Sequence, residues 1–481
     1  MSTVTASMLY DLVQCPHRLT MEIFGDPSQK DPESPFIELL WEKGTSFEQE
    51  VIEQLEVPYL DLRPYPNEER ERLTMEAMGR GESLIYGGRI RAGNLLGDPD
   101  LLRRQGNGYV AGDIKSGAGV EGATEDAEGR PKRHYAVQLA LYTDILERLG
   151  VAAERLPFIW DVHGEEVIYN LDAPQGRRTL GTLWDFYQSH LETALAILSR
   201  KVRTLPALGS NCKLCHWRTV CTAELETLDD LTLIPELGRS RRDAMLPYVT
   251  RVREMAEADL DSLVQGDRSV IAGIGASSLM RFHARAKLQI QAEAKPYLTE
   301  EIHLPRADLE LFFDIETDPM RDICYLHGFL ERRYRDNNTE RYVPFFVANP
   351  TPEEQERAFS EAWGYVRASM PCVIYYYSPY ERTWWRKLQR ACPNIATEEE
   401  VEEVFSDAIA VDLYQHVVRP RMEWPTRDYS IKTLATFLGF KWRDKHPSGP
   451  NPLSGIIDGW KAVIRKFAIA YLITTRTTAL L

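Results

Sequence analysis

Two aspartates and a lysine in the first quarter of the chain have types and spacing that could do metal-dependent chemistry. Asp100 lies in LLGDPDLL, and after twelve intervening residues AGDIKSG carries Asp113 and Lys115 as D-x-K. Side chains alternate along a strand, so Asp113 and Lys115 are expected on one face. Carboxylates can hold Mg²⁺ beside a phosphodiester, and a cation can orient water or stabilise developing charge. Taken alone, however, D-x-K is more often a strand end followed by a polar turn.

Further polar side chains flank this set. WEKGTSFEQEV places Glu48 on an expected helix, where it is either another metal ligand or a solvated glutamate. HYAVQLALYTDIL places Gln138 and Tyr142 at i,i+4 on one face of an amphipathic helix, next to apolar residues that would pack on a sheet. The polar pair on a buried edge is unusual.

The motifs G-x3-E, P-D, D-x-K and Q-x3-Y, in this order, resemble the RecB-like branch of the PD-(D/E)xK nuclease superfamily. The resemblance implies that Asp100, Asp113 and Glu48 bind Mg²⁺ or Mn²⁺. It also implies that Lys115 is catalytic and that the Q-x3-Y side chains support substrate or site geometry. Many relatives carry histidine where this chain has Glu48.

Four cysteines form a second group. Cys212, Cys215 and Cys221 form C-x2-C-x5-C, and Cys15 lies almost two hundred residues earlier. Four thiolates suit either Zn²⁺ or a [4Fe-4S] cluster, and spacing does not separate the two. RecB-like nucleases that carry a cluster have this split arrangement, so the resemblance favours iron and sulfur in a structural role. His216 is a less favoured substitute ligand. Three further cysteines, interpreted as buried or incidental, are Cys324, Cys372 and Cys392.

The bulk composition indicates a multidomain cytoplasmic protein. The chain has 481 residues, 43% of them hydrophobic, which exceeds one ordinary core. It has neither a long uncharged apolar run nor the pattern of a signal peptide, so no membrane partner is expected. Seven cysteines in a reducing compartment indicate metal rather than disulfides. The net charge of −15 argues against nucleic-acid binding, although a groove can be locally basic.

The elements that must position the first group form a mixed α/β core. Apolar periodicity and β-branched runs predict helices and strands over 36–55 (helix), 84–92, 95–103 and 108–114 (strands), and 133–149 and 177–200 (helices). We expect residues 1–224 to form the RecB-like nuclease domain with its four-cysteine staple.

Residues 225–300 are expected to be a helical linker. Periodicity predicts helix throughout 225–292, interrupted by IPELG and AGIG. Such glycine turns are similar to helix-hairpin-helix units, whose backbone amides can meet phosphates. Two ordinary helix connections explain them slightly better.

A third region, 308–449, alternates strands and helices. The strand LELFFDIE carries Asp314 and Glu316 on one face, and Glu381 and Asp412 follow as further metal candidates. A strand with a polar edge is an equally good interpretation. The run resembles the YprB-type ribonuclease H-like exonuclease domain, and the whole chain resembles RecB-family nucleases fused to that domain.

The resemblance stops after HPSG, and the closing motif Y-N-E-D-D-C is absent from the printed frame. Reading each codon from its third base, ITTRTTA (473–479) permits Y-N-E-D-D-C, and SGIIDGWK (454–461) permits W-Y-x-R-W-x-E. We therefore expect a frameshift near 450–453, an out-of-frame tail over 450–481 and an incomplete, inactive exonuclease domain. An unbroken frame on resequencing would remove this hypothesis.

These observations predict a nuclease that hydrolyses DNA phosphodiester bonds, acting as an exonuclease on single-stranded or terminal DNA. Its partners would be nucleic acid, mainly DNA, and a helicase, in DNA repair. The alternative is a catalytically inactive iron-sulfur or zinc protein that binds nucleic acid, and a third possibility is a decayed gene product.

Overall fold

The computed structural model describes residues 3–33, 35–122, 129–176, 181–318 and 321–439. The expected tail at 450–481 and the closing motif therefore lie outside the described residues. The chain divides into unit 1, Met1–Glu224, and unit 2, Leu225–Leu481. No helix among the described residues is long and apolar enough to cross a membrane.

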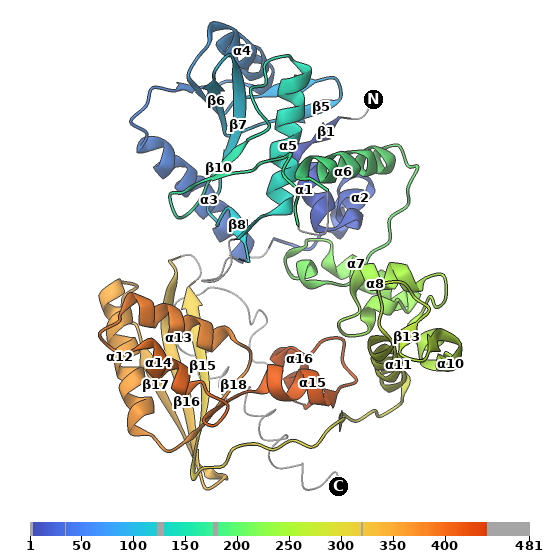
Figure 1. The fold of residues 1–481 in the computed structure, drawn as a ribbon, viewed down its shortest axis with the longest axis vertical. Helices are drawn as coiled ribbons and strands as arrows, with labels where there is room; N and C mark the ends of the chain where they lie inside the picture. The colour runs from blue at the N-terminus through green and yellow to red at the C-terminus, as the bar shows by residue number, and fades with distance from the viewer. Residues whose placement is uncertain (1–2, 34, 123–128, 177–180, 319–320, 440–481) are drawn as a thin grey trace. The chain divides into compact units, whose positions relative to one another are not determined.

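Unit 1 is built on a mixed six-stranded sheet (Figure 1). Its strands, in spatial order, are β11 (Glu166–Ile168), β10 (Phe158–Trp160), β7 (Gly108–Ile114), β6 (Leu101–Gln105), β3 (Leu84–Tyr86) and β2 (Leu60–Asp61). The central pair, β6 and β7, is an antiparallel hairpin, and β10 runs parallel to β7. A smaller sheet joins β1 (Val4–Thr5), β5 (Leu95–Gly97) and β4 (Ile90–Ala92).

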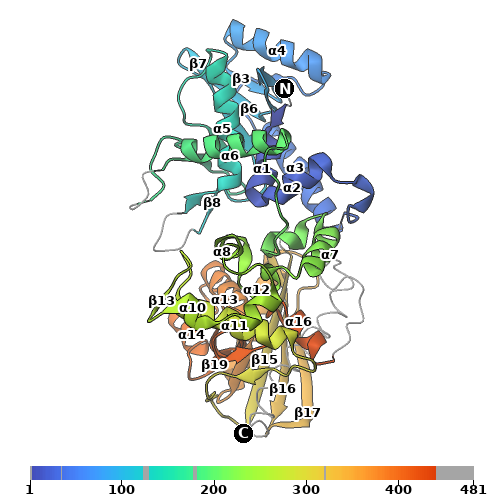
Figure 2. The ribbon, with the colours of Figure 1, turned by 90° about the vertical axis from the view of Figure 1, so that its right-hand side faces the viewer.

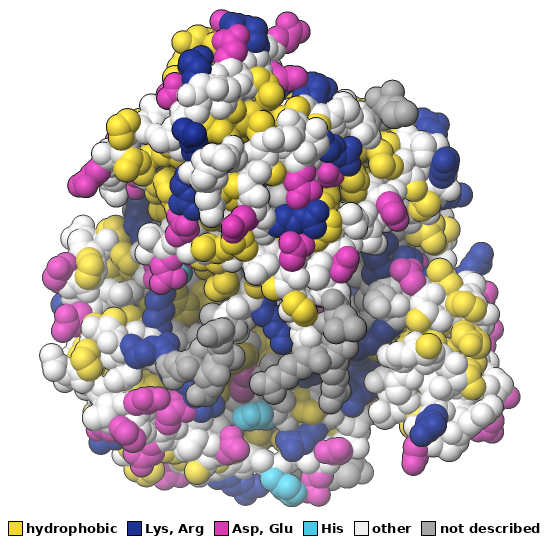
Figure 3. Space-filling view, turned by 45° about the horizontal axis from the view of Figure 1, so that its top comes forward, with side chains coloured by type: hydrophobic (Ala, Val, Ile, Leu, Met, Phe, Trp, Pro, Cys, Tyr) yellow, Lys and Arg dark blue, Asp and Glu magenta, His cyan; other side chains and the backbone are white. Residues whose placement is uncertain are grey.

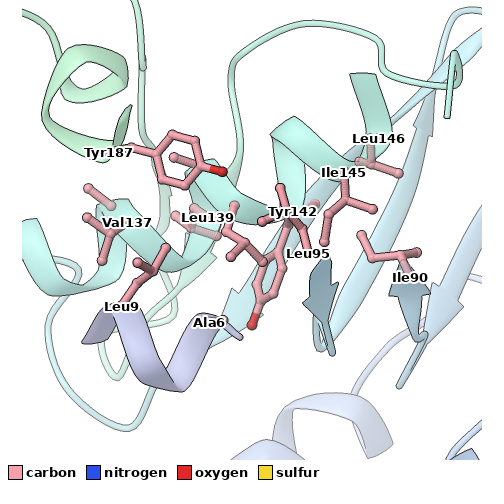
Figure 4. Packing of buried hydrophobic residues seen from close by; sticks show 14 of the residues in the cluster. Ala6, Leu9, Ile90, Leu95, Val137, Leu139, Tyr142, Ile145, Leu146 and Tyr187 are labelled. Atoms are coloured by element: carbon pink, nitrogen blue, oxygen red, sulfur yellow. The ribbon is translucent and has the colours of Figure 1, made fainter. Parts of the chain in front are cut away.

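Helices cover both faces of the large sheet. The main core lies between the sheet and α1 (Ala6–Gln14), α5 (Arg133–Arg148) and α6 (Leu183–Leu198). Figure 4 shows side chains of α5, including Val137 and Tyr142, meeting Leu9 of α1 and Leu95 of β5. On the other face, Phe47 of α3 (Pro35–Glu53) packs with residues of β3 and β7. The alternation of strand side chains divides the two cores.

One close approach fixes the loop that carries Asp100. A β carbon at Gly97 would lie 2.5 Å from the ring of Tyr142, so only glycine leaves room for the tyrosine there. The packing of α5 on β5 therefore holds the start of the G-D-P-D turn against the helix.

Two predicted strands of unit 1 are each divided in the structure. The segment 84–92 contains β3 and β4, and 95–103 contains β5 and the start of β6; each half belongs to a different sheet. Gly87, with φ of +68°, turns the chain in the first segment. The second segment turns at G-D-P-D, where proline interrupts strand pairing.

Unit 1 contains further helices besides those of its main core. They are α2 (Pro16–Phe24), α4 (Asn67–Arg80), α7 (Arg218–Leu228, which continues into unit 2) and the short 3-10 turns η1 (Pro27–Gln29) and η2 (Ser210–Leu214). A two-stranded ribbon, β8 (Val120–Glu121) with β9 (Arg130–Pro131), leads into α5.

Unit 2 contains a five-stranded sheet whose long strands are plain in Figure 2. The spatial order is β17 (Asp336–Phe346), β16 (Ile323–Arg333), β15 (Leu309–Asp318), β18 (Val373–Tyr376) and β19 (Ala410–Asp412). The first three strands are antiparallel neighbours, and β15, β18 and β19 run parallel.

Each face of this sheet has its own core. Phe313 and its neighbours pack under α12 (Pro352–Ala368), α13 (Tyr380–Ala391) and α14 (Glu398–Val404). Phe312 faces the opposite core, which is closed by η4 (Leu413–Val418), β20 (Met422–Glu423) and α16 (Ile431–Phe437). The short α15 (Arg419–Arg421) links η4 to β20. The period-2 pattern of LELFFDIE therefore places Asp314 on the same side of the strand as Phe312.

The helical segment at the start of unit 2 departs from uniform helix. It contains η3 (Leu231–Leu233), α8 (Gly238–Met245), α9 (Val252–Glu257), α10 (Leu260–Leu263) and α11 (Ala276–Ile290), but also a hairpin of β12 (Val264–Gln265) and β13 (Arg268–Ser269). Gly266, with φ of +62°, allows the tight turn between these strands. A further short pair joins β14 (Tyr297–Leu298) to β20.

A buried ion pair ties this segment to the rest of unit 2. Arg285 of α11 is fully buried, and its Nε donates to Glu423 Oε2 at 2.6 Å. The hydroxyl of Tyr429 donates to the same oxygen at 2.6 Å, and Arg285 Nη1 donates to the carbonyl of Pro235 at 2.9 Å. Breaking such a pair leaves an uncompensated buried charge, so these contacts hold α11 in place.

Candidate active site

The β6–β7 hairpin brings together the three residues of the first group. Leu101 pairs with Gly112 across the hairpin, and this register carries Asp100 opposite Asp113. Lys115 Nζ lies 2.8 Å from Asp113 Oδ2 and 3.9 Å from Asp100 Oδ2. Backbone amides also converge here, because Ile114 N donates to Asp100 Oδ2 at 2.8 Å. The arrangement is a compact group of two carboxylates and one ammonium.

The negative charges of Asp100 and Asp113 repel each other. Asp113 is only 2% exposed. Burial, followed by the charge of Asp113, raises the pKa of Asp100 to about 7, although Lys115 opposes the shift. Paired acidic oxygens with excess negative charge are the donors that a Mg²⁺ or Mn²⁺ ion prefers, so the residues fit such an ion.

Lys115 is held in its charged form. Burial lowers its pKa, but the charges of Asp113 and Asp100 outweigh burial and raise the pKa above its ordinary value. The side chain is therefore a permanent cation at neutral pH and cannot accept a proton there.

Glu48 on α3 accepts a hydrogen bond from Tyr86, a residue that no sequence motif indicated. The hydroxyl of Tyr86 donates to Glu48 Oε1 at 2.7 Å, and the tyrosine is fully buried in β3. The guanidinium of Arg63 lies over the ring of Tyr86, 3.9 Å from its centroid. Glu48 also contributes to the raised pKa of Asp100. The alternating pattern of LIY indicates only a core strand, so no local signal marks Tyr86 as a site residue.

The Q-x3-Y residues lie on α5 at different depths. Gln138 is half-buried, whereas Tyr142 is 4% exposed and packs over Gly97. The hydroxyl of Tyr142 is 3.5 Å from the carbonyl oxygen of Asp98, at the limit of a hydrogen bond. Tyr142 therefore supports the turn that carries Asp100.

The four cysteines of the second group (Cys15, Cys212, Cys215 and Cys221, called the cysteine quartet below) are all half-buried. Burial, followed by the charges of the other three thiols, raises the pKa of Cys221 to about 12. A soft metal ion would relieve this repulsion, so the chemistry of the four thiols fits iron-sulfur or zinc binding.

His216 is engaged elsewhere. Its Nε2 hydrogen-bonds to Glu22 Oε1, which also accepts from Trp217 Nε1 at 2.8 Å. Burial raises the pKa of Glu22, but hydrogen bonds from Lys30, His216 and Trp217 outweigh burial and lower the pKa to about 2. These contacts hold the His216 side chain against Glu22 of α2.

The candidates of unit 2 are spread over several elements. Asp314 is 7% exposed, and Glu316 lies two residues further on β15, before a register shift at Glu316/Thr317. Glu381 is 1% exposed in the first turn of α13. Burial raises the pKa of Cys324, and the charges of these three carboxylates add to the shift, so each of them lies near that thiol.

The Asp412 side chain accepts hydrogen bonds from the backbone. Its Oδ1 accepts hydrogen bonds from the backbone amides of Ser378 (3.0 Å), Tyr414 (2.9 Å) and Gln415 (3.0 Å). It thus caps η4 at the end of β19, two strands from β15, at a separation of about 10 Å by ordinary strand spacing.

Within the part of the chain that the structure describes, no three His, Cys, Asp or Glu side chains converge as a metal-binding group. In unit 1 the ammonium of Lys115 contacts both aspartates, and in unit 2 the carboxylates come from β15, α13 and β19. The candidate sites are therefore defined by their donor chemistry and by the residues that surround them.

Comparisons with known families agree with the two units. Residues 27–222 match the model of the PD-(D/E)XK nuclease superfamily, and residues 311–452 match the model of the RNase H superfamily. No match to the chain is found among curated proteins. The chain thus joins a PD-(D/E)XK nuclease superfamily domain to an RNase H superfamily domain.

Proposed function

We propose that the protein is a metal-dependent nuclease that hydrolyses DNA phosphodiester bonds at the Asp100 site, on single-stranded or terminal DNA. The observation that carries this proposal is the ammonium of Lys115, which lies 2.8 Å from Asp113 and 3.9 Å from Asp100. The match of residues 27–222 to the PD-(D/E)XK nuclease superfamily supports the same assignment.

Asp100, Asp113 and Glu48 would hold Mg²⁺ or Mn²⁺. When bound, the ion supplies charge stabilisation and a more acidic water molecule. Tyr86 fixes one oxygen of Glu48 by its hydrogen bond and leaves the other carboxylate oxygen for the metal.

Lys115 would act as a fixed charge. Its ammonium stays protonated beside two carboxylates, so its contribution is to orient water and to stabilise negative charge that develops on the phosphate. Proton removal must therefore fall to another group.

We also propose that unit 2 contributes no cleavage of its own. Asp412, one of its four candidate ligands, serves as a helix cap, and the printed sequence lacks the motif Y-N-E-D-D-C. The cysteine quartet would bind a structural [4Fe-4S] cluster, with Zn²⁺ as the alternative.

Substitution of Lys115 tests both proposals together. In the full chain, Lys115→Ala is expected to lower the rate of Mg²⁺-dependent cleavage of single-stranded DNA by about 10²- to 10³-fold. Binding of the same DNA should change little. Lys201→Ala is the matched control, because Lys201 is exposed and follows the end of α6.

Cleavage that survives Lys115→Ala would contradict the Asp100 site as the centre of hydrolysis and would direct attention to unit 2. A wild-type chain that binds DNA but never cleaves it would favour the catalytically inactive binding protein.

A further inference from the structure

Aromatic and basic side chains gather at the beginning of α5, next to the turn that follows Lys115. This α5 shelf consists of Tyr10, Lys132, His134 and Tyr135, all half-buried. The rings of His134 and Tyr135 have centroids 4.4 Å apart, and the ring of Tyr10 lies 5.1 Å from that of His134. The shelf thus presents a chain of aromatic surfaces that water can reach.

Two lysines border the same ring. Lys115 Nζ is 5.8 Å and Lys132 Nζ is 5.4 Å from the ring centroid of Tyr135. A β carbon at Gly117 would lie 3.7 Å from the hydroxyl of Tyr135 and 4.0 Å from Lys132 Nζ. The shelf therefore adjoins the candidate site directly, with Tyr135 between the two ammonium groups.

The backbone of the shelf is fixed. The amide of Lys132 donates to the hydroxyl of Tyr169 at 3.2 Å, and its carbonyl accepts from the amides of Tyr135 (3.1 Å) and Ala136 (2.9 Å). These bonds begin a helix of 16 residues that has no acidic residue in its first turn. Lys132 and Tyr135 are thereby held in a constant relation to Lys115.

Among the described residues, Lys132 and Lys115 differ in their charged partners. Lys115 is paired with two aspartates, whereas Lys132 Nζ forms no ion pair with a carboxylate of the described residues. The chain as a whole carries a net charge of −15, and basic and acidic side chains intermingle over the face shown in Figure 3. Attraction for a polyanion must therefore be local, and Lys132 supplies it beside the site.

We propose that the α5 shelf binds the nucleic-acid strand next to the bond that is cut, with Lys132 contacting the neighbouring phosphate and a base stacking on Tyr135. The inference rests on the proposed nuclease function and specifies its substrate as a single strand. In a duplex the faces of the bases are covered by their neighbours, but an unpaired base can stack on an aromatic ring beside a cation.

Binding measured without metal tests the shelf independently of cleavage. The full chain is titrated with a fluorescein-labelled oligothymidylate in EDTA, and fluorescence anisotropy gives Kd over a series of KCl concentrations. Because each phosphate contact to a single strand contributes about 0.7 to the slope of log Kd against log salt, Lys132→Gln should lower that slope by about 0.7. Lys132→Arg should restore the slope, and Lys201→Gln should leave it unchanged.

A second set of variants tests whether a base stacks on the ring of Tyr135. Tyr135→Leu should weaken single-strand binding by about 5- to 150-fold at constant slope, because one base loses its stacking partner. Tyr135→Phe keeps the ring and should retain the affinity, which separates stacking from misfolding. A blunt duplex of the same length should lose less than about twofold on Tyr135→Leu.

Two results would overturn the proposal: a Lys132→Gln slope equal to that of Lys201→Gln, or an equal loss of single-strand and duplex binding on Tyr135→Leu. Cleavage that survives Lys115→Ala would instead refute the Asp100 site as the centre of hydrolysis while leaving these slopes as measured. The two proposals therefore fail separately.

Discussion

Replacing Asp100 with asparagine is expected to make the metal-free protein more stable while abolishing cleavage. The amide is nearly isosteric with the carboxylate, and its oxygen can still accept the hydrogen bond from the amide of Ile114. What the substitution removes is the negative charge that faces Asp113 at the end of the hairpin. A side chain that serves a metal thus weakens the fold when the metal is absent.

The magnitude follows from the pKa of Asp100. In the unfolded chain the ordinary value is 3.8, and in the folded protein burial and Asp113 raise it to about 7. The difference corresponds to about 4 kcal/mol of lost stability above pH 7. Because 24% of the Asp100 side chain remains exposed, water screens part of the repulsion, and we expect a gain of about 2 kcal/mol in Asp100→Asn.

The sign of the pH dependence is fixed by the raised pKa. Below about pH 4 the folded and unfolded states both carry a protonated Asp100, so the variant and the wild type should differ little. As pH rises from 4 to 7 the folded protein must release a proton that the unfolded chain has already lost, and the gain in Asp100→Asn should grow.

Hydrogen–deuterium exchange of peptides covering β6 and β7, followed over urea concentration in EDTA, measures the free energy of unfolding of unit 1 apart from unit 2. Asp98→Asn is the matched control two residues away. Asp98 forms ion pairs with Arg70 (2.5 Å) and Arg89 (2.7 Å), so its loss should destabilise unit 1 by about 0.5–1 kcal/mol. If Asp100→Asn at pH 8 is as destabilising as Asp98→Asn, the electrostatic reasoning is refuted.

Two further expectations concern the surroundings of the site and the cysteine quartet. Tyr86→Phe removes the hydrogen bond to Glu48 and should raise the Mg²⁺ concentration needed for half-maximal cleavage by about 10- to 100-fold. Tyr109→Phe, which loses a hydrogen bond to the carbonyl of Glu82 between α4 and β3, should not change that concentration. Equal effects of the two variants would count against a positioning role for Tyr86. The full chain purified without oxygen should contain about four irons and four labile sulfides, and their removal should lower the Tm of unit 1; bound Zn²⁺ would instead assign the quartet to zinc, and no metal would exclude both.

Elements with strong local patterns could be predicted closely from the sequence. The helix expected over 133–149 is α5, Arg133–Arg148, and the strand expected over 108–114 is β7 with the same limits. Each has a regular apolar period and clear ends. The predicted strands that divide do so at glycine and proline turns, where a continuous apolar pattern hides a change of sheet. The β12–β13 hairpin was missed because two-residue strands carry almost no periodicity.

The proximity of Asp100, Asp113 and Lys115 could be predicted from the sequence because all three belong to one hairpin, where register follows from a short turn. The roles of Tyr86 and Tyr135 could not be predicted in this way. Their importance depends on contacts with side chains from other elements, and neither belongs to a spaced motif. Tertiary packing, which single-sequence patterns do not encode, decides which aromatic residues border a site.

The missing side chain at Gly97 couples two positions that are 45 residues apart in the sequence. Because the ring of Tyr142 occupies the space that a β carbon would need, Gly97→Ala and a smaller residue at 142 are each costly alone but relieve one another in the double variant. The order of the two substitutions therefore matters: Tyr142 on α5 has to be replaced by a smaller residue before Gly97 on β5 can be replaced by alanine. Libraries that vary the two positions separately would miss the accessible solutions, and libraries that vary them jointly would recover them.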